Sequence, residues 1–176
     1  MKLANIKYYS TVNAAGISTA VFVSGCHHKK HCPGCFNKIA WDGNYGHELT
    51  DELIDKIIEE TRPEYIRTLS ILGGEPMDVE NSEGVAKIVK RFREAFGDSK
   101  EIWVWTGYVM KDAPGEDEMQ TDDAEGCEFE YIPINEHSQY VLDNINVLID
   151  GPFVQSKYSI DLKYRGSSNQ RVIRLK

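Results

Sequence analysis

The chain has 176 residues, with 41% hydrophobic and 27% charged side chains, which is the size and composition of one globular domain. Its formal charge of −8 argues against nucleic acid or an anionic membrane surface as partner. No apolar run reaches the roughly 18 residues of a membrane span, and the N-terminus lacks the apolar core of a signal peptide. We therefore expect a cytoplasmic protein with reduced thiols.

Five short apolar runs in the chain predict strands. They are rich in β-branched and aromatic residues, as expected of strands that are buried in a parallel sheet. In chain order these runs are 19–24, 68–72, 102–106, 146–150 and 171–175.

Two helical patterns separate the first three predicted strands. Thr50 can cap a helix that carries Asp51 and Glu52 in its first turn and an apolar stripe up to Pro63. A second apolar stripe starts at Ser82 and ends before a glycine, a typical helix stop. Repeated strand, turn and helix predict right-handed βαβ units, so the expected fold class is α/β with a mostly parallel sheet.

Polar and glycine-rich segments follow the predicted strands. A cysteine-rich loop comes after the first strand, and the segments 73–76, 106–108 and 150–152 follow the next three. Because the carboxyl ends of parallel strands meet at one edge of a sheet, we expect a ligand site there.

Three of the four cysteines lie within ten residues, as Cys26, Cys32 and Cys35, with the spacing Cys-x5-Cys-x2-Cys. In a reducing compartment, thiols clustered in this way indicate metal ligands rather than a disulfide. The neighbouring Lys29 and Lys30 are expected to lower the thiolate pKa values. Three thiolates suit a cubane iron–sulfur cluster that leaves one iron open to another ligand.

A structural zinc site is the alternative interpretation of the same loop, because zinc takes a full set of four ligands. The fourth ligand would be His27, His28, His31 or Cys127. Otherwise the three histidines are expected to be exposed loop residues, and Cys127 to have no part in metal binding.

The acidity of the chain is concentrated in one segment, 112–136, which holds ten acidic and no basic side chains. The remainder carries 20 basic against 18 acidic residues. With Pro114, Gly115 and Gly126, the segment predicts a surface excursion rather than a core element. It is either a solvated loop or an insertion that faces a partner.

Six blocks of the sequence resemble the activating proteins of anaerobic (class III) ribonucleotide reductases, a family of the radical S-adenosylmethionine (SAM) superfamily. The resemblance covers the chain except for about residues 110–144. The family's loop usually has three residues between the first two cysteines, where this chain has five, and the acidic segment is interpreted as an insertion. The six blocks are 21–26, 32–37, 73–76, 102–108, 147–151 and 165–170.

The resemblance implies one radical SAM domain over 1–176, built as a partial (β/α) barrel. Cys26, Cys32 and Cys35 would hold a [4Fe-4S] cluster whose open iron chelates the amino and carboxylate groups of SAM. One electron would cleave SAM into methionine and a 5′-deoxyadenosyl radical, which takes hydrogen from a glycine of the reductase. The implied partners are the reductase large subunit and an electron donor such as flavodoxin. An activase of another glycyl-radical enzyme is the related alternative.

The resemblance also implies residues that contact SAM. Gly73, Gly74 and Glu75 match the family's site for the SAM amine, where residues without Cβ let backbone carbonyls approach an ammonium group. Gly34 and Phe36 flank Cys35 at positions that lie against the adenine.

Other residues at the strand ends are expected to have lesser roles. Thr106, Gly107 and Asp150 are expected to contact SAM or substrate. Trp103 and Trp105 share one face of their strand by its two-residue period, which predicts packing rather than an electron route. The block 165–170 is either a structural turn or a docking site for the reductase glycine loop.

Overall fold

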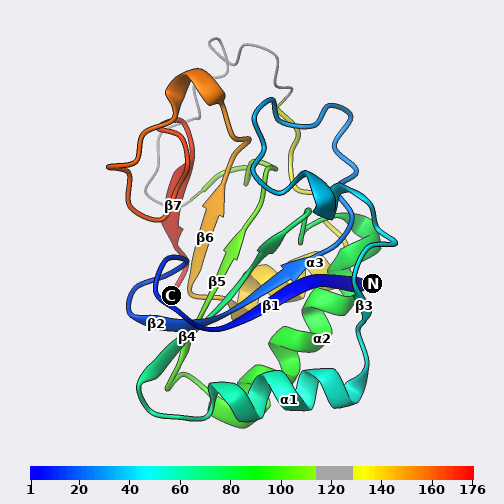
Figure 1. Ribbon diagram of the computed structural model, residues 1–176, viewed down its shortest axis with the longest axis vertical. Coiled ribbons are helices and arrows are strands. Elements are labelled where there is room, and N and C mark those ends of the chain that lie inside the picture. The colour runs from blue at the N-terminus through cyan, green and yellow to red at the C-terminus, as the bar shows by residue number, and fades with distance from the viewer. Residues whose placement is uncertain (114–128) are drawn as a thin grey trace.

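The computed structural model describes residues 1–113 and 129–176. Within these ranges seven strands form one sheet, in the order β3-β1-β2-β4-β5-β6-β7 (Figure 1). In chain order the strands are β1 (Lys2–Ser10), β2 (Ile17–Val23), β3 (His47–Glu48), β4 (Ile66–Gly73), β5 (Glu101–Trp105), β6 (Val147–Asp150) and β7 (Arg171–Arg174). The helices are α1 (Asp51–Thr61), α2 (Val79–Phe96) and α3 (Glu136–Asn144), with 3-10 turns η1 (Lys38–Trp41) and η2 (Gln155–Lys157).

The four central strands of the sheet run parallel. β2 pairs with β4, β4 with β5, and β5 with β6 in parallel, whereas β1 and β7 are antiparallel additions on either side. Helices α1, α2 and α3 connect successive central strands, as βαβ units require. The predicted α/β class with a mostly parallel sheet is confirmed, and the partial barrel stays a prediction.

The five predicted strands and both predicted helices are present. Thr50 caps α1, since its side chain accepts a hydrogen bond from the backbone N–H of Leu53 at 3.2 Å. α2 begins at Val79, one turn before Ser82, and Gly97 ends it with a positive φ of 53°. No helix in the described ranges is long and apolar enough to cross a bilayer.

Three elements were missed from the sequence: β1, β3 and α3. β1 alternates partly buried and exposed residues, so it has none of the continuous apolar character of the central strands. α3 begins at Glu136, the last residue of the predicted acidic excursion, and Asn135 caps it by accepting from His137 N and Ser138 N. A short amphipathic helix of this kind depends on packing more than on its own propensity.

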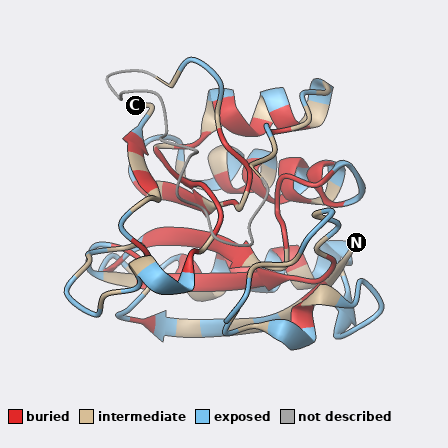
Figure 2. Cartoon of the chain, turned by 90° about the horizontal axis from the view of Figure 1, so that it is seen from above, coloured by how far each residue is buried: buried red, intermediate tan, exposed pale blue. Residues whose placement is uncertain are grey.

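The main core lies between the sheet and the helices. The inward side chains of α1, α2 and α3 form one apolar cluster with Val21, Ile71 and Val104 of the sheet. Figure 2 shows the central strands largely buried and the helices banded with buried and exposed residues. The other face of the sheet carries Trp103 and Trp105, whose ring centroids are 6.0 Å apart. The predicted packing role is confirmed for Trp103, which is only 4% exposed, whereas Trp105 packs beside it but is only partly buried.

Candidate metal and cofactor site

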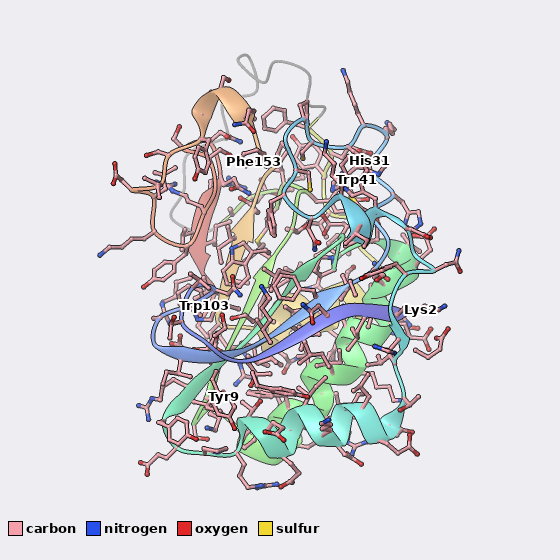
Figure 3. All side chains as sticks on the ribbon, viewed as in Figure 1. Lys2, Tyr9, His31, Trp41, Trp103 and Phe153 are labelled. Carbon is pink, nitrogen blue, oxygen red and sulfur yellow. The ribbon has the colours of Figure 1, made fainter. Side chains whose placement is uncertain are left out.

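A cavity of about 390 Å³ opens at the carboxyl ends of the central strands, on the sheet face that carries the tryptophans. Its volume is within the range of small-molecule cofactor sites. Figure 3 shows His31 and Trp41 of the cysteine-loop side and Phe153, which follows β6, at this end of the molecule. The predicted location of the site at this edge agrees with the structure. A larger hollow of about 500 Å³ beside α3 is lined by none of the predicted site residues.

The cavity brings together Cys26, Cys32 and Cys35, each of which is partly exposed. The loop that carries them is attached to the fold at its start and end. The backbone N–H of Gly25 donates to Ala40 O at 2.9 Å, and that of Cys26 to Trp41 O at 3.3 Å. Separate thiols on one cavity wall are the arrangement that a shared metal cluster requires.

The expectation of a lowered thiolate pKa is wrong for Cys26. Burial, followed by the negative charge of Glu75, raises the pKa of the Cys26 thiol above its ordinary range. The positive charges of the loop lysines do not offset these two effects. Binding of a metal at Cys26 therefore has to displace a proton.

His28 is not the exposed loop residue that the sequence predicted. Its side chain is 7% exposed, and its Nε2 and Nδ1 lie 2.8 Å from Glu75 Oε2 and 3.2 Å from Glu130 Oε1. Its ring also lies 4.1 Å from that of Tyr108, centroid to centroid. Burial alone would lower the pKa of His28, but the two carboxylates outweigh it and raise the pKa above its usual value.

The carboxylate of Glu75 is buried and fully hydrogen-bonded within the protein. Oε1 accepts from Met77 N at 3.0 Å and from the Thr106 hydroxyl at 2.5 Å. Oε2 accepts from Gly107 N at 2.7 Å and from His28 Nε2. Glu75 thus lines the cavity but joins three loops, and its carboxylate has no lone pair left over for an ammonium group.

Gly73 and Gly74 line the cavity and are required by close backbone packing. A Cβ on Gly73, whose φ is +122°, would lie 2.5 Å from Val23 N. A Cβ on Gly74 would lie 2.2 Å from Gly25 O. The two glycines therefore let the end of β4 pass directly beside the start of the cysteine loop.

The structure places some of the remaining predicted contact residues at the cavity and others away from it. Phe36, 85% exposed, lines the cavity together with Thr106 and Gly107. Gly34 is not among the lining residues, and at φ +77° it lies against the side chain of Gln155. Asp150 is not among them either.

Asp150 has a structural partner in place of a ligand. It is fully buried and forms a two-pronged ion pair with Arg171, with Nε to Oδ1 at 2.9 Å and Nη2 to Oδ2 at 2.6 Å. Its Oδ2 also accepts from Met110 N at 2.7 Å. Both carboxylate oxygens of Asp150 therefore already accept hydrogen bonds within the protein, and neither is free for the predicted contact with SAM or substrate.

The acidic segment has a structural role at its C-terminal end. Glu130 bonds to His28 and accepts from Lys29 N at 3.1 Å, and Ile132 is part of the main core. Residues 129–136 are therefore not the surface excursion that was predicted. Most of the acidic segment, with Cys127, lies outside the described residues.

Sequence reasoning missed the wall of the cavity that the segment between β6 and β7 provides. Phe153, Tyr164, Arg165 and Gln170 belong to this wall. The segment 165–170 forms a hydrogen-bonded turn, because Gln170 Oε1 accepts from Gly166 N and Gln170 Nε2 donates to Gly151 O at 2.9 Å. Docking of the reductase glycine loop at this turn stays a prediction. The sequence feature that indicates this wall is the polar block 165–170, directly before the last strand.

The donor atoms at the cavity fit an iron–sulfur cluster. His27 is hydrogen-bonded to Asp78 at 2.9 Å, and His28 to its two carboxylates. His31 donates to Cys26 O at 2.9 Å and stacks on Trp41. The three thiols are thus the metal-binding groups that the described loop presents to the cavity.

Comparison with known families agrees with this donor set. Residues 12–173 match the family model of the 4Fe-4S single cluster domain. The fold and the site therefore define a single-cluster iron–sulfur protein built on an α/β sheet.

Curated relatives identify the family more closely. The chain is 37% identical to the anaerobic ribonucleoside-triphosphate reductase-activating protein of Escherichia coli (strain K12), over 97% of each chain. It is 36% identical to that of Vibrio cholerae over 96% of each chain. The corresponding protein of Enterobacteria phage T4 is 31% identical, over 92% of this chain and 86% of its own length. The chain belongs to the family of anaerobic ribonucleoside-triphosphate reductase-activating proteins.

Proposed function

We propose that this protein is a radical SAM activase that installs a glycyl radical on the large subunit of an anaerobic ribonucleotide reductase. The observation that carries the proposal is that Cys26, Cys32 and Cys35 line one cavity with the turn at Gly73 and Gly74. The relatives are named as activators of that reductase, and the matched domain is a single-cluster 4Fe-4S domain.

The fold supports the proposal at the level of architecture. The helices pack on one face of the sheet, and the cavity opens on the other. We infer that the sheet is the partial barrel of the radical SAM superfamily, with the cavity on its inner side, and that residues 1–176 form one domain. The acidic segment, about residues 112–136, is an insertion in this scheme.

The residues of the cavity have distinct proposed roles. The three cysteines hold the [4Fe-4S] cluster, which when bound supplies the electron that cleaves the sulfonium bond of SAM and yields methionine and a 5′-deoxyadenosyl radical. The backbone at Gly73 and Gly74 lies beside the amine of SAM, and Phe36 offers an apolar surface for its adenine. The carboxylate of Glu75 positions the surrounding loops, because its own hydrogen bonds are complete.

The partners follow from the same proposal. The hydrogen atom comes from a glycine of the reductase, so that glycine has to reach the mouth of the cavity. The mouth presents exposed apolar side chains, Val12, Phe36 and Tyr158, which suit contact with a protein loop. The cluster also needs an electron donor, and we propose a flavodoxin.

The test is formation of a glycyl radical in the partner. Anaerobically reconstituted protein, SAM and a strong reductant are mixed with the cognate reductase large subunit, and the glycyl signal is followed by EPR. We expect the Cys32→Ala variant to give no signal and the matched Cys127→Ala variant to give the wild-type signal.

Other outcomes identify the alternatives. A colourless protein with one zinc ion per chain and no SAM cleavage would contradict the proposal and favour a zinc-stabilised binding module. SAM cleavage without a glycyl signal in the ribonucleotide reductase would point to another glycyl-radical enzyme as the partner.

A further inference from the structure

Arg165 is a cation on the wall of the cavity, in the segment between β6 and β7. The residue is half-buried, and its Nη1 donates to Gln170 O at 2.6 Å. The surrounding turn is fixed, because Gln170 Oε1 accepts from Gly166 N at 2.8 Å and from Ser167 N at 3.2 Å. The side chain therefore extends from a turn that is held by its own hydrogen bonds.

The guanidinium of Arg165 has no acidic partner among the described residues, and Gln170 O is its one hydrogen-bond acceptor there. Arg171, six residues further on, differs in this respect, because it is paired with Asp150 through two hydrogen bonds. An arginine that loses part of its hydration without gaining a counter-charge is costly, unless a ligand supplies the anion.

The other charged groups on the cavity wall do not provide that anion. Within the described residues the wall carries Glu75 and His28 besides Arg165. Glu75 and His28 are bonded to each other at 2.8 Å, and both oxygens of Glu75 already accept two hydrogen bonds each. Among the acidic and basic side chains on this wall, Arg165 is thus the one whose charge no described neighbour matches.

We propose that Arg165 binds the carboxylate at the amino-acid end of SAM, an assignment that rests on the proposed function. SAM carries one carboxylate, and the planar guanidinium fork matches a carboxylate in geometry as well as in charge. Arg165 would hold the methionine part of SAM in the cavity that the three cysteines line. An acidic side chain of the reductase is the other source of the same chemistry, and the test separates the two.

The test compares two ligands and three variants in a binding measurement without reductase. Equilibrium dialysis of the reconstituted protein is done with SAM and with decarboxylated SAM. We expect Arg165→Gln to raise the Kd for SAM by about 10- to 100-fold, the value of charge-assisted hydrogen bonds, and to leave the Kd for decarboxylated SAM within about twofold. Arg165→Lys keeps the charge without the fork and should lie between.

Arg62→Gln is the matched control, because Arg62 is exposed at the end of α1 and pairs with Glu59. It should bind both ligands as the wild type does. Iron content and melting temperature are recorded for each variant. If Arg165→Gln does not retain its cluster, the assignment is judged on Arg165→Lys, which should still bind SAM more tightly than decarboxylated SAM.

Three results would overturn the assignment. Wild-type affinity of Arg165→Gln for SAM, or equal weakening toward both ligands, would leave Arg165 a purely structural residue. Normal SAM binding by Arg165→Gln, together with weakened binding of the reductase large subunit in a separate titration, would assign the carboxylate to the partner. If the wild-type protein with a full cluster binds no SAM, the proposed function itself fails, and this assignment with it.

Discussion

At the scale of single residues, His28 shows how tertiary structure changes the meaning of a sequence feature. In the sequence it is one of three histidines in an unusually long cysteine loop. In the structure its two ring nitrogens bond to Glu75, next to the glycine turn, and to Glu130, at the end of the acidic segment. The cysteine loop, the turn after β4 and the C-terminal end of the acidic segment therefore meet at one side chain.

Replacement of His28 tests this contact. His28→Ala removes two partly buried hydrogen bonds and leaves each of the two carboxylates without one of its donors. We expect the free energy of unfolding of the metal-free protein, measured by urea denaturation, to fall by about 2 kcal/mol. His137→Ala, at a partly exposed site beside Glu136, is the control and should change it by less than about 0.5 kcal/mol. Equal small effects in both variants would show that the His28 contacts do not stabilise the fold.

At the scale of elements, the junction of β4 with the cysteine loop positions the site. The backbone N–H of Gly74 donates to Val23 O at 2.8 Å, and that of Glu75 donates to Gly25 O at 2.7 Å. These bonds attach the turn after β4 to the start of the cysteine loop. The lack of a side chain at residue 74 is what lets the two backbones meet.

A methyl group at residue 74 should separate the two segments. In Gly74→Ala the new Cβ would lie 2.2 Å from Gly25 O, a contact between backbone atoms that no side-chain rotation relieves. We expect a loss of about 2 kcal/mol or more in unfolding free energy and a lower iron content after reconstitution. In the control Gly43→Ala, the nearest atom would be 3.7 Å away. If Gly74→Ala matches that control in both measurements, the close approach is not required.

The sequence identified the central elements better than the outer ones. Buried parallel strands such as β2 and β4 are continuous apolar runs, and α1 has both a cap and an apolar stripe, so local patterns were enough. β1 and α3 have weaker patterns because each is partly exposed. They take their conformation from pairing and packing, which a single sequence does not display.

At the scale of the whole molecule, the net charge of −8 is not a property of the site. Seven of the acidic side chains and no basic one lie in 114–128, so removal of that segment changes the charge from −8 to −1. Glu130, by contrast, is part of the described fold through His28. The C-terminal end of the acidic segment is therefore part of the fold, and residues 114–128 lie outside the described residues.

Deletion of 114–128, with a short Gly-Ser linker in its place, tests the role of that charge. We expect folding and glycyl-radical yield to stay within about twofold of the wild type, as for a solvated loop. The same deletion with Glu130→Ala should in addition lose about 1 to 2 kcal/mol of unfolding free energy, because a bond to His28 is removed. A drop in reductase binding on deletion, reproduced in the wild type by added salt, would instead identify a partner-facing loop.

The sequence by itself determined the α/β class, the position of the site at the strand ends and the three candidate cysteine ligands. These properties follow from local periodicity, turn chemistry and residue spacing, which are all features of the sequence itself. Tertiary structure decided which groups remain available to a ligand. The carboxylates of Glu75 and Asp150 are taken up by partners from distant segments, while Arg165 is left facing the cavity. Hydrogen bonds between residues far apart in the sequence settle that distinction, and they exist only after the chain has folded.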